Sequence, residues 1–100
     1  MNKALNLKIL DKAEGDMLAI SEYISRDNTI AAANLLKRFY KVFEILAQYP
    51  EIGTKRPDFT YKDVMFYVVK KNYLIIYKTE RDNIYILRVL PVYKDICAIL

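Results

Sequence analysis

Hydrophobic positions change their spacing twice along this chain. Near the N-terminus Leu5, Leu7 and Ile9 alternate with less apolar residues, and a period of two predicts a half-buried strand. From Asp11 the spacing lengthens to that of a helix. Asp11 is expected to cap this helix, with Glu14 three residues later completing a capping box. The apolar side of the predicted helix consists of Ala13, Met17, Ile20 and Ile24.

A second and longer helix is predicted after a short polar break at residues 25–29. Either Asn28 or Thr29 can cap it, and the pattern continues to about Gln48. Its broad apolar stripe consists of Ala32, Leu35, Leu36, Phe39, Val42, Phe43 and Leu46. Pro50 and Gly53 follow, and these residues end helices. Two long helices joined by so short a break are expected to pack as an antiparallel hairpin.

The second half of the chain has the pattern of strands. An irregular basic stretch covers residues 53–62. Segments 63–69, 73–79 and 84–90 are rich in β-branched and aromatic residues, with polar turns at 70–72 and 80–83. This spacing predicts an antiparallel meander that Pro91 ends. Residues 94–100 form a short terminal element, for which the pattern leaves helix and strand both open.

The order of elements predicts one α+β domain over residues 1–100. Strand, helix, helix, strand, strand and strand follow one another, with the helical hairpin packed on one face of a mostly antiparallel sheet. The other face is expected to stay partly open, with tyrosine and basic side chains that could meet a partner.

The composition excludes several classes of protein. The chain has 100 residues, 54% of them hydrophobic, with one cysteine and no histidine. A single thiol cannot form an internal disulfide, and without histidine a zinc or haem site is not expected. We therefore expect no metal and no cofactor. The chain shows no secretory signal and no stretch long enough to span a membrane, which predicts a cytoplasmic protein.

Positive charge is concentrated in the second half of the chain. Residues 1–54 contain seven basic and seven acidic side chains, whereas residues 55–100 contain nine basic and five acidic ones. The whole net charge of +4 therefore lies in the second half. Such an excess favours an anionic partner, either a nucleic acid or an acidic protein surface, although it is also compatible with an ordinary solvated surface.

No familiar catalytic constellation is present. Histidine, the usual acid–base catalyst near neutral pH, is missing, and there is no phosphate-binding glycine loop or nucleophilic serine elbow. Phosphodiester cleavage can in principle use Arg, Lys and Tyr alone, and the chain has nine tyrosines. Most of these tyrosines occupy helix and strand positions, where tyrosine packs well.

Several short motifs occur in an order typical of one protein superfamily. They are residues 13–24 (AEGDMLAISEYI), 28–32, 46–53 (LAQYPEIG), Arg56-Pro57, 73–77 (YLIIY) and 88–95 (RVLPVYKD). Together they resemble the RelE/ParE superfamily of bacterial toxins over nearly the whole chain, and ParE more than RelE. The resemblance implies the toxin of a type II toxin–antitoxin pair of the plasmid-stabilising kind. It also implies a cognate antitoxin that forms a hetero-oligomer with it.

The resemblance also bears on the mechanism. RelE-like members cut messenger RNA on the ribosome, whereas ParE-like members inhibit DNA gyrase. The strand lysines of the nuclease members fall at Met65 and Tyr67, and their strand arginine at Leu74. Their late arginine falls at Lys94 and their terminal tyrosine near Leu100. Four of these five positions lack the needed chemistry, which favours a gyrase inhibitor that binds its target and is not an enzyme.

Three cations of the basic half are the candidate target contacts, namely Arg56, Arg88 and Lys94. Two alternatives remain open. One is a ribosome-dependent endoribonuclease with a rearranged site of Tyr67, Lys70 and Lys94, and the other is a degenerate binding module without toxicity.

Overall fold

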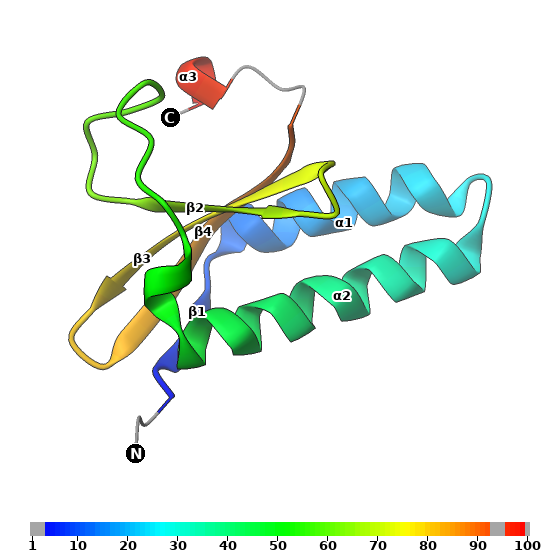
Figure 1. The fold of residues 1–100 in the computed structure, drawn as a ribbon. Coiled ribbons are helices and arrows are strands. Elements are labelled where there is room, and N and C mark those ends of the chain that lie inside the picture. The colour runs from blue at the N-terminus through cyan, green and yellow to red at the C-terminus, as the bar shows by residue number, and fades with distance from the viewer. Residues whose placement is uncertain (1–3, 93–95, 100) are drawn as a thin grey trace.

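The computed structural model describes residues 4–92 and 96–99. Figure 1 shows a helical hairpin lying against one face of a sheet. In chain order the elements are β1 (Asn6–Ile9), α1 (Asp11–Ser25), α2 (Thr29–Gln48), the 3-10 turn η1 (Pro50–Ile52), β2 (Met65–Val69), β3 (Tyr73–Glu80), β4 (Asn83–Pro91) and α3 (Ile96–Ile99). The predicted α+β fold and the order of its elements are confirmed, and the terminal element is a helix.

The sheet is mixed because its first strand is parallel to its last. The strand order is β1-β4-β3-β2, with β1 parallel to β4 and the other two pairs antiparallel. The helical hairpin therefore forms the connection from the edge strand β1 to β2 at the opposite edge. Local pattern alone predicts the meander of β2, β3 and β4. The pairing of β1 with β4 joins segments more than seventy residues apart and follows from tertiary structure.

The two long helices begin in different ways. Asn28 caps α2, because its Oδ1 accepts a hydrogen bond from the backbone N–H of Ala31 at 2.9 Å. The predicted capping box of Asp11 and Glu14 is wrong. Leu10 occupies the N-cap position of α1 without a side-chain hydrogen bond, and Asp11 is the first helical residue. Asp11 and Glu14 instead place negative charge in the first turn, where the helix dipole favours it.

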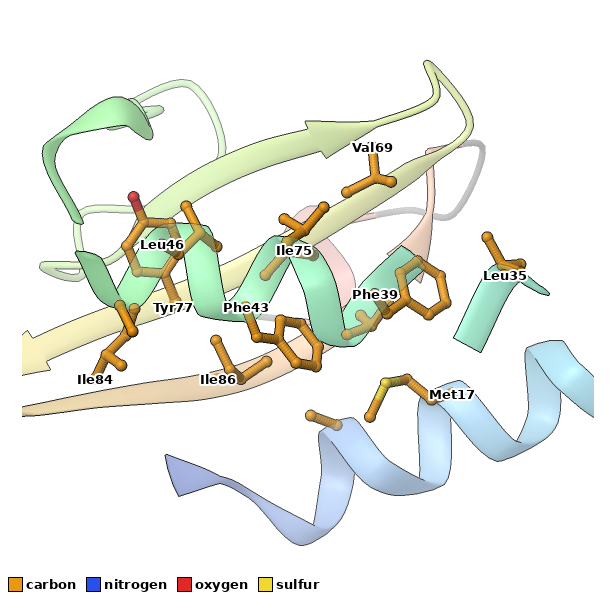
Figure 2. Close-up of a cluster of buried hydrophobic side chains, with 14 residues drawn as sticks. Met17, Leu35, Phe39, Phe43, Leu46, Val69, Ile75, Tyr77, Ile84 and Ile86 are labelled. Atoms are coloured by element: carbon orange, nitrogen blue, oxygen red, sulfur yellow. The ribbon is translucent and has the colours of Figure 1, made fainter. Parts of the chain in front are cut away.

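The main core lies between the hairpin and the sheet (Figure 2). The apolar stripe of α2 supplies Phe39, Phe43 and Leu46, all of which are fully buried. They pack against β3 and β4, and α1 closes the cluster with Ala13 and Met17. Burying a large apolar side chain stabilises a fold by roughly 1.5–3 kcal/mol, so this contact carries much of the stability.

A second apolar cluster covers part of the face of the sheet that we expected to be partly open. Phe66, Leu74, Ile76 and Leu90 project from the strands on this face. The loop between η1 and β2 and the helix α3 lie over them and contribute Phe59, Val64, Ile96 and Ile99. The expectation of a partly open face with tyrosine and basic side chains therefore holds at one end of the sheet, where Lys78 and Tyr85 pair across the strands and are partly exposed. The irregular basic stretch contains enough apolar residues to form a lid.

A buried tyrosine ties the start of that lid to the sheet. The hydroxyl of Tyr77 in β3 donates to the carbonyl oxygen of Pro50 at 2.6 Å and accepts from the N–H of Gly53 at 3.0 Å. A Cβ atom on residue 53 would overlap this hydroxyl, so only glycine fits. Tyr77 thus satisfies two backbone groups where α2 has ended and the chain turns back across the sheet.

Both hairpin turns of the meander contain residues in the left-handed backbone region. The values of φ are 53° at Lys70, 63° at Lys71 and 56° at Arg81. Three residues, 70–72, connect β2 to β3, and a hydrogen bond from the Asn72 N–H to the Val69 carbonyl at 3.1 Å closes a β-turn around Lys70 and Lys71. Such turns favour Asn-Gly, and each non-glycine residue in this region costs about 1 kcal/mol or more.

Candidate functional site

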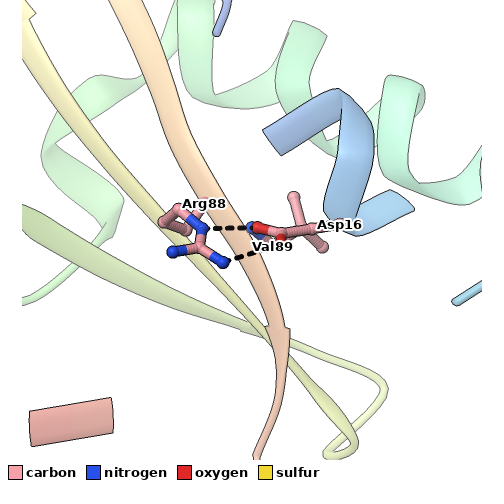
Figure 3. A network of polar contacts seen from close by, with 3 residues as sticks. All are labelled: Asp16, Arg88 and Val89. Carbon is pink, nitrogen blue, oxygen red and sulfur yellow. Dashed lines mark hydrogen bonds and ion pairs between the residues drawn. The ribbon is translucent and has the colours of Figure 1, made fainter. Parts of the chain in front are cut away.

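Three hydrogen bonds join α1 to β4 at one polar junction between distant segments (Figure 3). Asp16 on α1 accepts two hydrogen bonds from the Arg88 guanidinium, with Nε–Oδ2 and Nη2–Oδ1 distances of 2.7 and 2.8 Å. Its Oδ2 also accepts the backbone N–H of Val89 at 3.0 Å. The Asp16 side chain is 13% exposed and that of Arg88 24%. Hydrogen bonding to Asp16 raises the pKa of Arg88 above its usual value, so the guanidinium stays charged.

A bulge in β4 and the end of β1 leave the Val89 N–H without a strand partner, and the Asp16 carboxylate accepts its hydrogen bond. Ile76 pairs with Arg88 and Tyr77 with Ile86, so Leu87 is an extra residue that forms a β-bulge. Strand β1 ends at Ile9, and its last ladder contact is the hydrogen bond from the Leu10 N–H to the Ile86 carbonyl. Beyond this point no strand within the described residues pairs with this edge of β4. Asp16 supplies the acceptor for the first N–H on that free edge.

A groove runs along this edge, between α1 and the far end of β4. Its volume is about 540 Å³, and most of its lining is apolar. The wall from α1 includes Ala19, Ile20 and Tyr23, whereas Val89 and Pro91 form the opposite wall. The Tyr23 side chain is 70% exposed although it lines a groove. An exposed apolar groove beside a free strand edge is a typical binding surface for a peptide segment.

The free edge offers acceptors and no donors. The N–H of Val89 is bonded to Asp16, and Pro91, the next residue to face the same edge, has no N–H. Only carbonyl oxygens of these two residues can therefore pair with a partner along the groove. The edge is thus protected against full strand addition, which reduces the risk of unwanted pairing between chains.

Comparisons with known proteins decide the family. The family model described as "ParE toxin of type II toxin-antitoxin system, parDE" matches residues 7–95. The chain belongs to the ParE toxin family. A search of curated proteins found no significant match. Among solved structures the chain is similar to one described as "Chromosomal ParDE TA system from P. aeruginosa", with a TM-score of 0.74 and 21% identity. The alignment covers 88% of this chain and 96% of that one, and it shows that the two share a fold.

The three target contacts predicted for this ParE-family chain lie in different places. Arg56 is in the lid, where its guanidinium forms two hydrogen bonds with Asp58 and stacks on the Phe59 ring at 4.1 Å. Arg88 lies at the junction with α1, and two of its five N–H donors are used by Asp16. Lys94 lies outside the described residues.

The alternative nuclease residues are also separated by their environments. Tyr67 is half-buried and packs against the main core under the helices. Lys70 is exposed at the β2–β3 turn. Of the nuclease positions, Met65 also packs against the main core, and Leu74 is buried in the second cluster. In the described part of the chain, these positions therefore contribute packing.

Two features of the site were not predicted from the sequence. Asp16 lies outside the apolar side that the sequence predicts for its helix, and the local pattern contains no signal that its partner is Arg88, seventy-two residues away. The local pattern likewise contains no signal that the Tyr77 hydroxyl bonds Pro50 and Gly53, because tyrosine is common in strands. In residues 4–92 and 96–99 no group of three acidic or sulfur side chains is placed to hold a metal ion. Neither long helix there has the apolar content needed to cross a bilayer.

Proposed function

We propose that this ParE-family toxin acts by binding DNA gyrase, without making or breaking a covalent bond, and that a cognate antitoxin neutralises it. The main support is the chemistry of the strand positions where the resemblance locates nuclease groups. Met65, Tyr67 and Leu74 stand there, and all three pack into apolar clusters. A nuclease needs cationic groups to stabilise the phosphate and a base to activate the 2′-hydroxyl. Met65 and Leu74 supply neither, and the Tyr67 side chain packs against the main core.

Arg56, Arg88 and Lys94 are the proposed contacts with the target. The Arg56 side chain is 41% exposed, and its pairing with Asp58 and Phe59 holds the planar guanidinium in one orientation. A preorganised arginine at a surface loses little conformational freedom on binding, and arginine is common among the residues that dominate interfaces. Arg88 keeps three N–H donors for a partner while its pair with Asp16 stays formed.

The test is a supercoiling assay with purified gyrase and increasing amounts of the purified chain. We expect inhibition that disappears when the cognate antitoxin is added. Full gyrase activity at a large molar excess of the chain would reject the proposed target. Primer extension on translated messages after induction of the toxin distinguishes gyrase inhibition from the nuclease alternative. Specific cleavage of these messages would identify a ribosome-dependent endoribonuclease. Overexpression without growth arrest would instead indicate a binding module without toxicity.

We further propose that the antitoxin occupies the groove between α1 and β4. The groove is apolar, and Tyr23 on its wall is exposed to a degree unusual for a groove residue. Tyr23→Glu is expected to weaken antitoxin binding at least tenfold, because it introduces a charge that binding would desolvate. Tyr61→Glu is the matched control, since Tyr61 is fully exposed in the lid. Equal effects of the two substitutions would exclude the groove as the antitoxin site.

A further inference from the structure

One row of side chains crosses three strands at the end of the sheet that the lid leaves partly exposed (Figure 1). The strand register places Lys8 of β1 beside Tyr85 of β4, and Tyr85 beside Lys78 of β3. Successive side chains of a strand point to opposite faces of the sheet. Ile84 and Ile86 pack under the helices, so Tyr85 and its two neighbours project from the other face. A tyrosine with a lysine on each side therefore stands on this surface.

Both lysines of the row have their ammonium groups available to an anion. No salt bridge among the described residues includes Lys8 or Lys78, and Lys8 is exposed. The Lys78 ammonium lies 5.7 Å from the centre of the Tyr85 ring. That distance is close to the limit of a cation–π contact. The ring therefore holds the ammonium only weakly, and a phosphate would bind it more strongly.

The next row along the same strands supplies groups that can bond the edge of a base. It consists of Asn6, Asn83 and Glu80, which project from the same face by the same alternation. Side-chain amides bond donors and acceptors on base edges, and a carboxylate accepts from an exocyclic amino group such as that of cytosine. The two rows together place a ring, two cations and three polar groups on one face of the sheet.

A hollow of about 490 Å³ continues this surface toward the lid. Its lining includes the cations Lys62 and Lys78 and the carboxylates Asp63 and Glu80. The Asp63 carboxylate is paired with Lys55 at 2.8 Å, which offsets its charge. A bound strand can therefore extend from the two rows toward the lid, where it meets a third lysine.

We propose that this surface binds single-stranded nucleic acid, with a base stacked on Tyr85 and the flanking phosphates on Lys8 and Lys78. Aromatic rings among cations bind single strands because each base has a face to stack and each linkage carries a charge. A duplex keeps its bases stacked on one another and gains nothing from the ring. An acidic peptide also gains nothing from the ring, and the Glu80 carboxylate repels it. The combination of ring, lysines and carboxylate therefore selects a single strand.

This surface goes beyond the proposed function and does not depend on gyrase being the target. It is also separate from the strand positions where the resemblance locates nuclease groups. Met65 and Tyr67 pack against the main core on the helical face, and Leu74 is buried in the second cluster. The proposal concerns binding alone, without a covalent step.

The experiment measures binding of the full chain to a fluorescent single strand of about 12 nucleotides over a range of salt concentrations. The decisive probe is an abasic strand of the same length, which keeps the phosphates and lacks the bases. We expect the original chain to bind the abasic strand about tenfold or more weakly, because stacking is lost. A duplex of the same sequence and a poly-glutamate peptide should also bind more weakly. DNA and RNA versions of the strand show which of the two binds more tightly.

Two kinds of variant separate the ring from the charges. Tyr85→Leu removes the ring and should lose about tenfold in affinity, whereas Tyr85→Phe keeps the ring and should stay within about threefold of the original. Lys8→Gln/Lys78→Gln should lower the slope of log affinity against log salt by about 1.4, or 0.7 for each phosphate contact on a single strand. The control Lys37→Gln/Lys41→Gln removes the same charge from exposed lysines of α2 and should keep the original slope.

Thermal melting checks that each variant is folded. The abasic comparison uses the original chain, so it decides the question even where Tyr85→Leu unfolds. Four results would overturn the proposal. They are absence of single-strand binding at low salt, equal binding of the abasic strand, tighter binding of the duplex or the peptide, and equal salt slopes in the two double-lysine variants. None of them depends on the supercoiling assay, so failure of this site and failure of gyrase inhibition can be told apart.

Discussion

The N–H of Gly53 donates a hydrogen bond to the hydroxyl of Tyr77 across 24 residues of sequence, at 3.0 Å. The same hydroxyl donates to Pro50 at 2.6 Å, so one side chain satisfies both backbone groups at the turn after α2. The lid over the second cluster starts from this turn. The position of the lid, and with it that of Arg56, therefore depends on a phenol buried in the sheet.

Tyr77→Phe is predicted to destabilise the fold by about 1–3 kcal/mol. The ring still fills its space, but the buried N–H of Gly53 and the carbonyl of Pro50 lose their partner. Urea denaturation measures the change in the free energy of unfolding. Tyr85→Phe is the control, because its hydroxyl accepts only a long hydrogen bond of 3.4 Å from Asn83. Equal stability of Tyr77→Phe and the original chain would show that the hydrogen bonds of the Tyr77 hydroxyl with Gly53 and Pro50 do not stabilise the fold.

The same tyrosine predicts a pH dependence at the alkaline end. Burial raises the pKa of Tyr77 above its usual value of 10.0. Between the unfolded and folded pKa values the native state retains a proton that the unfolded state has lost, so stability falls as pH rises. The contribution of Tyr77 is complete below pH 10.0 and is lost above it. The difference in unfolding free energy between the original chain and Tyr77→Phe should shrink from pH 9 to pH 11. A difference in unfolding free energy that stays constant over this pH range would contradict the raised pKa of Tyr77.

The two glycines of the chain are predicted to respond to alanine in opposite directions. Gly15→Ala should stabilise the fold by about 0.5–1 kcal/mol, because the site on α1 is open and alanine favours helices. Gly53→Ala should cost about 2 kcal/mol or more, since its Cβ would overlap the Tyr77 hydroxyl in a packed core. Thermal and urea unfolding of the pair provide the measurement. Stabilisation by both substitutions would show that the turn at Gly53 can shift away from the Tyr77 hydroxyl.

The pair of Asp16 and Arg88 is predicted to contribute about 2 kcal/mol to stability, less than a fully buried pair because Arg88 is 24% exposed. Asp16→Ala removes the partner of Arg88 and the acceptor of the Val89 N–H. Asp63→Ala, which breaks the exposed pair with Lys55, should have no measurable effect. Arg88→Met combined with Asp16→Ala completes a double-mutant cycle. A coupling energy of zero would mean that the two groups act independently.

Arg56 is predicted to contribute to target binding more than its neighbour Lys55. Arg56→Ala should raise the concentration needed for half-maximal gyrase inhibition at least tenfold, because it removes a preorganised guanidinium. Lys55→Ala removes one charge from the same loop and should change it less than threefold, since Lys55 is already paired with Asp63. Circular dichroism confirms that both variants fold. Equal effects would indicate that only the net charge of the loop matters.

Local pattern was sufficient to predict most of the fold. The apolar stripe of α2, the start of α2 at a cap of Asn28 or Thr29 and the turns between the last three strands depend on neighbours within a few residues. Their periods and turn residues are therefore visible in the sequence. The predicted capping box at Asp11 is wrong because the position of the N-cap depends on where pairing of the preceding strand β1 with β4 ends. Leu10 still bonds to β4 through its N–H, so it becomes the N-cap.

The sequence by itself determined the fold class, the order of the elements and the absence of a histidine-based catalytic site. Only the tertiary structure decided that Asp16 holds Arg88, that Tyr77 anchors the lid and that the lid covers part of the second face of the sheet. It also showed that Lys8, Tyr85 and Lys78 form one row across three strands. Local conformation follows from short-range periodicity. Pairing between distant side chains depends on how the helical hairpin is placed on the sheet, and no local pattern records that placement.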